Sequence, residues 1–275
     1  MAKTRVLITV KTYPTLSGKY DELVCTAGFR EDGSWIRIYP IQFRQKSYDQ
    51  QYSKYDWIEI DLTRNTSDFR PDTFRPVDLE TEINVIDHLD TGSKRDWAAR
   101  KDIVLQNVYE DMSVLISEAK NKEICTSLAV FKPTKILDFT AEPVEREWDE
   151  KKLLQLNQLN LFNHMDDKGK FEVVKKLPYK FKYRFKDSNG DESNMMIEDW
   201  EVGQLYWRQL AKYDGDEVKA IADVRLKYFD HFVNDCDLYF FLGTSKVHHF
   251  TSRNPFMIIG AFYPPKSIEG DLFKQ

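Results

Sequence analysis

The chain has 275 residues, of which 41% are hydrophobic and 14% aromatic, and its formal net charge is −5. This length suits one large domain or two small ones, and the many rings exclude a disordered chain, which is typically poor in aromatic residues. The negative charge excludes a protein that is drawn to nucleic acid by its overall field, but it is compatible with a local basic surface.

The first eighty residues favour short strands separated by turns. Residues 6–13 alternate apolar and polar side chains, and an Asp-Gly turn at 32–33 joins two further extended stretches as a hairpin. Residues 55–62 predict another strand. Because no helical stretch intervenes, we expect residues 1–87 to form a small antiparallel β-barrel.

The middle of the chain predicts helices. Helical sequence runs through residues 94–105 and 109–122, and a third helix is expected at 148–162 with acids in its first turn. Residues 126–140 return to an extended pattern. We therefore expect residues 88–165 to be mainly helical.

The last part of the chain, residues 166–275, mixes both kinds of element. Residues 179–186, with the sequence YKFKYRFK, and residues 194–197 predict a strand pair around an Asn-Gly turn. Two amphipathic helices and two buried strands are then expected, at residues 198–213, 216–233, 237–244 and 255–265. The fold class predicted for the whole chain is α+β.

The cysteines and the termini bear on localisation. Cys25, Cys125 and Cys236 are widely spaced, which predicts neither a zinc site nor a disulfide framework. The N-terminal apolar run is too short for a signal peptide, and no stretch is long enough to span a membrane. We expect a cytoplasmic protein without a membrane partner.

Three N-terminal stretches carry a resemblance. LITVKTYP, ELVCTAGFREDGSWIRIYPIQFR and KYDWIEIDL, within residues 7–62, together resemble the first barrel of bacterial dual-OB-type proteins, which implies an OB-like barrel. The rest of the chain resembles uncharacterised prokaryotic proteins in which DWE, FFLGT and IIG-x-FYPP recur in this order. This second resemblance implies no activity and no functional residue; the look of the family suggests mobile-element or phage-defence (antiviral) systems.

One side of the predicted N-terminal hairpin carries both rings and cations. In an extended strand Trp35, Arg37 and Tyr39 face the same way, and Lys11 on the first strand extends this side. OB barrels use such surfaces to stack rings on bases and to bring cations to phosphates. In the alternative, the two rings cover a helix while Arg37 pairs with a carboxylate.

Two Phe-Arg-Pro units follow at residues 69–71 and 74–76. Each proline biases the arginine before it toward extended geometry, so Arg70 and Arg75 are candidates for stiffly held phosphate contacts. In the alternative, the prolines only shape a connection and the phenylalanines are fixed in the core.

The segment YKFKYRFK gives the strongest indication of a binding surface. On a strand its rings share one face and its cations share the other. The candidate backbone-binding residues are Lys180, Lys182, Arg184 and Lys186. A bound polyanion would relieve the mutual repulsion of these like charges. The alternative is an ordinary half-buried strand whose lysines provide solubility and protect a sheet edge.

Arg225 falls within the apolar stripe of the helix predicted at 216–233. A buried guanidinium needs a carboxylate, a set of carbonyls or a bound anion. We expect a structural partner such as Asp199 or Asp237, and a ligand phosphate is the less favoured alternative.

A metal-dependent, nuclease-like enzyme is the competing function. Divalent cations bind clustered carboxylates, so Asp199, Glu201 and Asp237 around Arg225 are the catalytic candidates, with Mg²⁺ as the cofactor of this alternative alone. Against it, Asp199 lies where a helix N-cap is expected.

The sequence therefore favours a non-catalytic protein that binds DNA or RNA and needs no cofactor or metal. The two alternatives are the nuclease-like enzyme and an assembly component whose aromatic and basic faces meet another protein. The sequence does not distinguish single from double strands.

Overall fold

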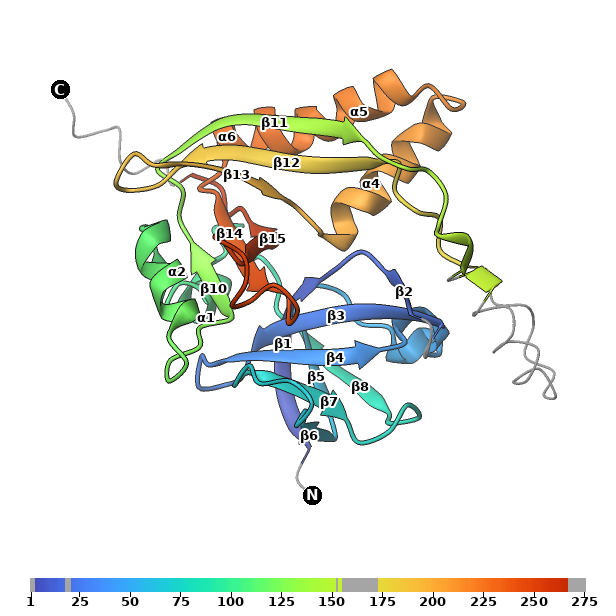
Figure 1. Ribbon diagram of the computed structural model, residues 1–275, viewed down its shortest axis with the longest axis vertical. Coiled ribbons are helices and arrows are strands. Elements are labelled where there is room, and N and C mark those ends of the chain that lie inside the picture. The colour runs from blue at the N-terminus through green and yellow to red at the C-terminus, as the bar shows by residue number, and fades with distance from the viewer. Residues whose placement is uncertain (1–2, 18–20, 152, 155–172, 267–275) are drawn as a thin grey trace.

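The computed structural model describes residues 3–17, 21–151, 153–154 and 173–266. The fold is mixed α+β: a strongly curled N-terminal sheet lies at one end, and two smaller sheets with helices form the rest (Figure 1). Within these residues, every helix is too short or too polar to cross a membrane.

The curled sheet has the strand order β6-β7-β4-β3-β1-β5-β8, and β2 pairs with β3 beside this path. Its strands are β1 (Thr4–Lys11), β2 (Thr15–Ser17), β3 (Asp21–Phe29), β4 (Trp35–Ile41), β5 (Asp56–Ile60), β6 (Leu62–Arg64), β7 (Thr73–Pro76) and β8 (Ile83–His88). The 3-10 turns η1 (Phe43–Gln45) and η2 (Tyr48–Gln50) follow β4.

The expectation of a purely antiparallel barrel is wrong, because β4 and β7 are parallel. Parallel neighbours need a long connection, and the segment that contains β5 and β6 provides it. The hairpin predicted at Asp32-Gly33 is confirmed between β3 and β4. Gly33 has a φ of +78°, a conformation that L side chains rarely adopt.

The middle of the chain is mixed. It contains α1 (Ala98–Val104), β9 (Val108–Tyr109), α2 (Met112–Lys120), β10 (Leu128–Phe131) and β11 (Lys135–Pro143). The expectation of a mainly helical segment at 88–165 is therefore wrong for its described part, since buried β10 pairs with a distant C-terminal strand. Residues 150, 151, 153 and 154 begin the third predicted helix, whose remainder lies outside the described residues.

The C-terminal strands and helices agree with the prediction. They are β12 (Tyr179–Lys186), β13 (Glu192–Met196), α4 (Trp200–Lys212), α5 (Glu217–Arg225), the π-helical segment η3 (Leu226–His231), α6 (Phe232–Asp235), β14 (Tyr239–Thr244) and β15 (Phe256–Phe262). They complete a sheet in the order β15-β14-β10-β9 and another in the order β11-β12-β13.

The hydrophobic core joins the two ends of the chain. Leu7 and Phe29 of the curled sheet pack in one cluster with Val130, Phe241 and Phe262 of the four-stranded sheet. A second cluster joins the three-stranded sheet to the helices α4, α5 and η3, and also to α2 and the four-stranded sheet. The helices thus cover one face of the three-stranded sheet and leave the other face outward (Figure 1).

Candidate nucleic-acid interface

Strand β12 separates its rings from its cations, as predicted. Phe181, Tyr183 and Phe185 are buried in the core beneath the helices. Successive strand residues point to opposite faces, so the cations lie on the outward face of the sheet. We call them the cation row: Lys180, Lys182, Arg184 and Lys186.

Burial of the rings fixes this orientation. Phe181 packs on Phe139, the Tyr183 hydroxyl donates to the backbone carbonyl of Tyr228, and Phe185 packs on Phe240. Each fully buried ring contributes about 1.5–3 kcal/mol relative to exposure. A shift of one residue in register would bury the cations and expose the rings, so the cation row is held outward.

Acids on the neighbouring strands pair with part of the cation row. Lys182 Nζ lies 2.5 Å from a carboxylate oxygen of Glu142 on β11, and Lys186 Nζ lies 3.7 Å from Glu192 on β13. With the described residues, Lys180 and Arg184 form no ion pair. Exposed pairs contribute about 0–1 kcal/mol, so a phosphate can replace either carboxylate at little cost.

The carboxylate across the strands from Arg184, Asp138, pairs with Arg225 instead. Asp138 of β11 is opposite Arg184 in register, but its carboxylate accepts a hydrogen bond from Arg225 Nη1 at 2.9 Å. Arg225 also donates to the Phe139 carbonyl, and its guanidinium lies 4.4 Å from the centre of the Phe229 ring. This arrangement leaves Arg184 without its cross-strand acid.

The partners expected for Arg225 are therefore wrong, although a structural carboxylate was the correct kind of partner. Neither Asp199 nor Asp237 pairs with it, because Arg225 lies where α5 packs against the edge strand β11. Its side chain is 41% exposed, so the expected burial is also wrong.

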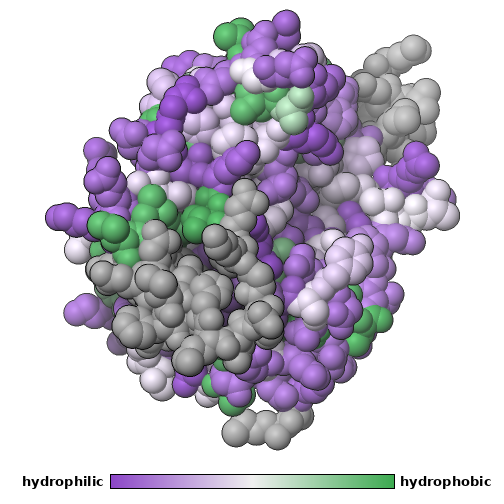
Figure 2. All heavy atoms as spheres, turned by 90° about the vertical axis from the view of Figure 1, so that its right-hand side faces the viewer, coloured by the Kyte–Doolittle hydropathy of each residue, from purple (hydrophilic) through white to green (hydrophobic). Residues whose placement is uncertain are grey.

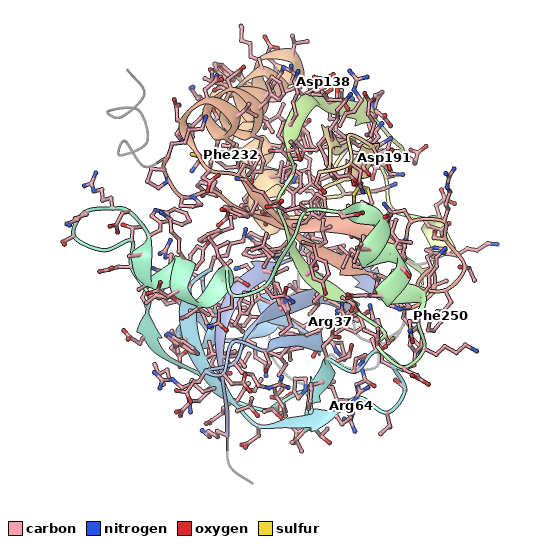
Figure 3. The ribbon with its side chains drawn as sticks, turned by 90° about the vertical axis from the view of Figure 1, so that its left-hand side faces the viewer. Arg37, Arg64, Asp138, Asp191, Phe232 and Phe250 are labelled. Atoms are coloured by element: carbon pink, nitrogen blue, oxygen red, sulfur yellow. The ribbon has the colours of Figure 1, made fainter. Side chains whose placement is uncertain are left out.

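The predicted aromatic and basic side of β4 is not an exposed surface. Arg37 is 2% exposed and pairs with Asp72 at 2.8 Å, and it also donates to the Ser127 hydroxyl and carbonyl at 2.7 and 3.0 Å. The Trp35 ring packs against Phe241 of β14. Figure 3 shows Arg37 well inside the molecule, where the four-stranded sheet covers this side of β4.

Tyr39, the third residue of that side, is half-buried, and burial raises its pKa. Of the alternative interpretation, the pairing of Arg37 with a carboxylate is confirmed, whereas the Trp35 ring contacts Phe29 and Phe241, which both lie on strands.

Lys11 is also buried. Its ammonium lies 3.9 Å from the centre of the Phe43 ring and 4.7 Å from that of Trp200, and it donates to the Tyr52 carbonyl at 3.2 Å. Burial, together with the nearby charge of Lys54, lowers the pKa of Lys11 to about 8. Lys11 is therefore part of the interior rather than of an open face.

The two Phe-Arg-Pro arginines differ. Arg70 is buried, pairs with Asp68 at 2.5 Å and donates to the Thr244 carbonyl. Arg75 is exposed, and its guanidinium lies 3.3 Å from the Val77 carbonyl. Only Arg75 of this pair is presented to solvent.

The carboxylates proposed for catalysis do not gather around Arg225. Asp199 caps α4 by accepting from the Glu201 amide at 3.1 Å, and Lys54 Nζ lies 2.8 Å from Asp199 and 3.1 Å from Glu201. Burial raises the pKa of Asp199 against the attraction of Lys54. The N-cap expected at Asp199 is confirmed.

Asp237 belongs to another part of the structure, where it pairs with Lys132 and accepts from the Tyr239 hydroxyl at 2.8 Å. Across the part of the chain that the structure describes, no three or more His, Cys, Asp or Glu side chains are grouped to hold a metal ion.

Two features escaped sequence reasoning. Lys54, which pairs with both Asp199 and Glu201, lies in a turn that carries no pattern of its own. Phe250 stacks on Phe69 across the molecule, and the Phe-Arg-Pro unit was a signal only for Phe69.

Comparison with known families gives two matches. Residues 108–275 match a family described as Domain of unknown function (DUF8757), and residues 2–106 match one described as Domain of unknown function (DUF8758). A comparison with curated proteins finds no match.

The two matched segments share one hydrophobic core. The domain boundaries predicted near residues 88 and 166 stay predictions.

Proposed function

Because the chain belongs to the DUF8757 family, whose description names no activity, we propose from geometry alone that it is a non-catalytic nucleic-acid-binding protein. The cation row on the outward face of β12 contacts the sugar-phosphate backbone. The observation that carries the proposal is the separation of buried rings from outward cations on the central strand of the three-stranded sheet.

The local charge supports this proposal. The cation row carries four positive charges, and Glu142 and Glu192 offset two of them, while Asp138 is held by Arg225. Residues two apart on a strand are about 6.6 Å apart, so the row extends over about 20 Å. An extended polyanion can therefore contact all four cations at once.

The alternatives have less support. Among the carboxylates of the enzyme alternative, Asp199 and Glu201 share Lys54, whereas Asp237 pairs with Lys132. Outside the grey atoms, the face in Figure 2 is mainly hydrophilic, with hydrophobic residues in small separate groups, so this part of the surface offers no broad apolar protein interface.

The resemblance of the N-terminal stretches to an OB-type barrel adds no contact residue to this proposal, since Trp35 and Arg37 are covered by the rest of the fold. A role in mobile-element or phage-defence systems stays a prediction from the resemblance of the family.

The test compares oligonucleotide binding by the wild type and by the triple variant Lys180→Ser/Lys182→Ser/Arg184→Ser. With four phosphate contacts to a single strand, the logarithm of the affinity falls with the logarithm of salt concentration with a slope of about −2.8. A fourfold rise in salt then weakens binding roughly fifty-fold. The triple variant retains one contact, so its slope should fall to about −0.7.

A matched control removes the same charge elsewhere on the surface. Lys3 precedes β1, and Lys94 and Arg95 precede α1; all three are exposed, and their triple replacement by Ser should leave the slope near its wild-type value. Equal binding by both triple variants would contradict the proposed function.

A further inference from the structure

Two phenylalanine rings stack on the surface of the protein. Phe69 lies between β6 and β7, and Phe250 lies between β14 and β15. Their ring centres are 4.9 Å apart, with an angle of 28° between the ring planes. The two residues are 45% and 40% exposed, although rings of this size are usually buried. We call them the ring pair.

Both loops of the ring pair are anchored to the interior. Next to Phe250, the buried His249 ring donates to the Ala119 carbonyl at 2.7 Å and is hydrogen-bonded to the Thr244 hydroxyl at 2.8 Å. Next to Phe69, the buried Arg70 donates to the Thr244 carbonyl. Because both loops are bonded to Thr244, they lose little conformational entropy when a ligand binds.

Segments next to the ring pair carry positive charge. Residues 245–254 contain Lys246 and Arg253, and residues 119–125, which His249 contacts, contain Lys120 and Lys122, against the single acid Glu123. All four cations are exposed, and they form no ion pair within the described part of the chain. A ligand here meets a positive field although the whole chain is negative.

The acids closest to this surface in the sequence are already neutralised. Asp68, beside Phe69, pairs with Arg70, and Asp72 pairs with Arg37. The two buried arginines that were predicted to contact phosphates therefore act indirectly, by removing negative charge from the surroundings of the ring pair.

A hollow lies between the loop that carries Phe250 and the β12–β13 hairpin that carries the cation row. It has a volume of about 840 Å³, and Arg253 and Asn254 line it on one side and Asn194 of β13 on the other. Asn194 is opposite Arg184 in register, so the hollow begins beside the cation row. Figure 3 shows Asp191, in the β12–β13 turn, and Phe250 toward the same side of the molecule.

The carboxylates in the hollow are largely occupied. Asp187 is buried and accepts from three backbone amides, including that of Met112, and Glu192 pairs with Lys186. Asp191 remains as the exposed acid at the rim. A chain that lies along the cation row therefore ends near Arg253, in the same loop as Phe250.

We infer that the Phe69–Phe250 ring pair is a base-stacking platform, so that the ligand of the cation row is a single-stranded nucleic acid. The inference rests on the proposed function. Bases of a single strand offer their faces to exposed rings, whereas bases of a duplex are already stacked on one another.

The experiment measures, by fluorescence anisotropy, the affinity for oligothymidylate, for an abasic strand of equal length and for a duplex. The wild type should bind oligothymidylate about fivefold or more tightly than the abasic strand, because stacking contributes to the first alone. Phe69→Ala/Phe250→Ala should weaken oligothymidylate binding about 5- to 150-fold and leave the abasic strand and the duplex unchanged.

Two further variants separate stacking from loss of apolar surface or of the fold. Phe250→Trp retains an aromatic face and should keep the preference for bases. Val247→Ala removes exposed apolar area from the same loop without removing a ring, and it should bind like the wild type. Thermal unfolding of each variant checks that the loops remain folded.

The outcomes distinguish the two proposals. If the cation-row triple variant binds the abasic strand as the wild type does, the proposed function fails, and the ring-pair inference fails with it. If that variant loses the abasic strand but the ring-pair variant keeps the full preference for bases, only the stacking inference is overturned.

Discussion

Strands β4 and β12 both carry rings and cations in alternating sequence, yet the structure uses their cations in opposite ways. Arg37 of β4 is enclosed between the curled sheet and the four-stranded sheet, where Asp72 and Ser127 satisfy it. Lys180 and Arg184 of β12 remain in solvent, because the helices cover only the other face of their sheet. The comparison teaches that alternation decides which residues share a face, whereas packing decides whether that face stays open.

Removing a cation from β4 should therefore cost much more folding stability than removing one from β12. A buried guanidinium is tolerated only with a complete set of partners, and removing it leaves a carboxylate without compensation. An exposed guanidinium can be removed at little cost to stability. The following four predictions test this difference, from the largest expected effect to the smallest.

Replacing Arg37 with Met should destabilise the fold by about 3–5 kcal/mol, because Asp72 loses its buried partner. The matched change Arg184→Met on β12 should alter the free energy of unfolding by less than about 0.5 kcal/mol. Urea denaturation followed by fluorescence measures both. Similar losses in the two variants would remove the distinction between the strands.

Lys11, another buried cation among the N-terminal candidates, should make stability depend on pH. Its pKa in the folded state, about 8, lies below its ordinary value of 10.5, so the unfolded chain binds more protons between these values. Stability contributed by this group therefore rises as pH increases from about 8 to 10.5, by about 3 kcal/mol in total.

Comparison with Lys11→Met separates the pH dependence of stability due to Lys11 from that due to the buried tyrosines. The variant should gain stability relative to the wild type below pH 8, and the gain should shrink as pH rises. A difference between the two proteins that does not change between pH 7 and 10 would contradict the burial of a charged Lys11.

Arg225 should influence binding without belonging to the cation row. Arg225→Gln releases Asp138, which then pairs with Arg184 and competes with phosphate. We expect oligonucleotide affinity to fall about two- to fivefold, the range of one exposed ion pair. Adding Asp138→Asn should restore it, and failure of this rescue would show that Arg225 acts in another way.

Replacing the two acids beside the cation row should change oligonucleotide affinity least of the four predictions. Glu142→Gln/Glu192→Gln frees Lys182 and Lys186, so oligonucleotide affinity should rise about twofold while stability changes by less than about 1 kcal/mol. Weaker binding in this variant would place the nucleic acid elsewhere. Titrations at low salt measure the change best, because salt screens exposed charges.

Local features of the fold could be predicted from the sequence. The hairpin at Asp32-Gly33, the cap at Asp199 and the two faces of β12 each depend on residues close together in the chain. The parallel pairing of β4 with β7 could not be predicted, since no local pattern encodes it.

In the candidate site, too, local features could be predicted from the sequence and long-range contacts could not. The cation row follows from alternation alone, whereas the pairing of Arg225 with Asp138 joins residues 87 positions apart. The contact between Phe69 and Phe250 likewise depends on two distant loops that meet where Arg70 and His249 both bond to Thr244.

By itself, the sequence determined which side chains each strand presents together, because strand geometry has a fixed period of two residues. Only the tertiary structure decided that β4 is enclosed and β12 is not, because covering a face depends on apolar surface supplied by distant segments.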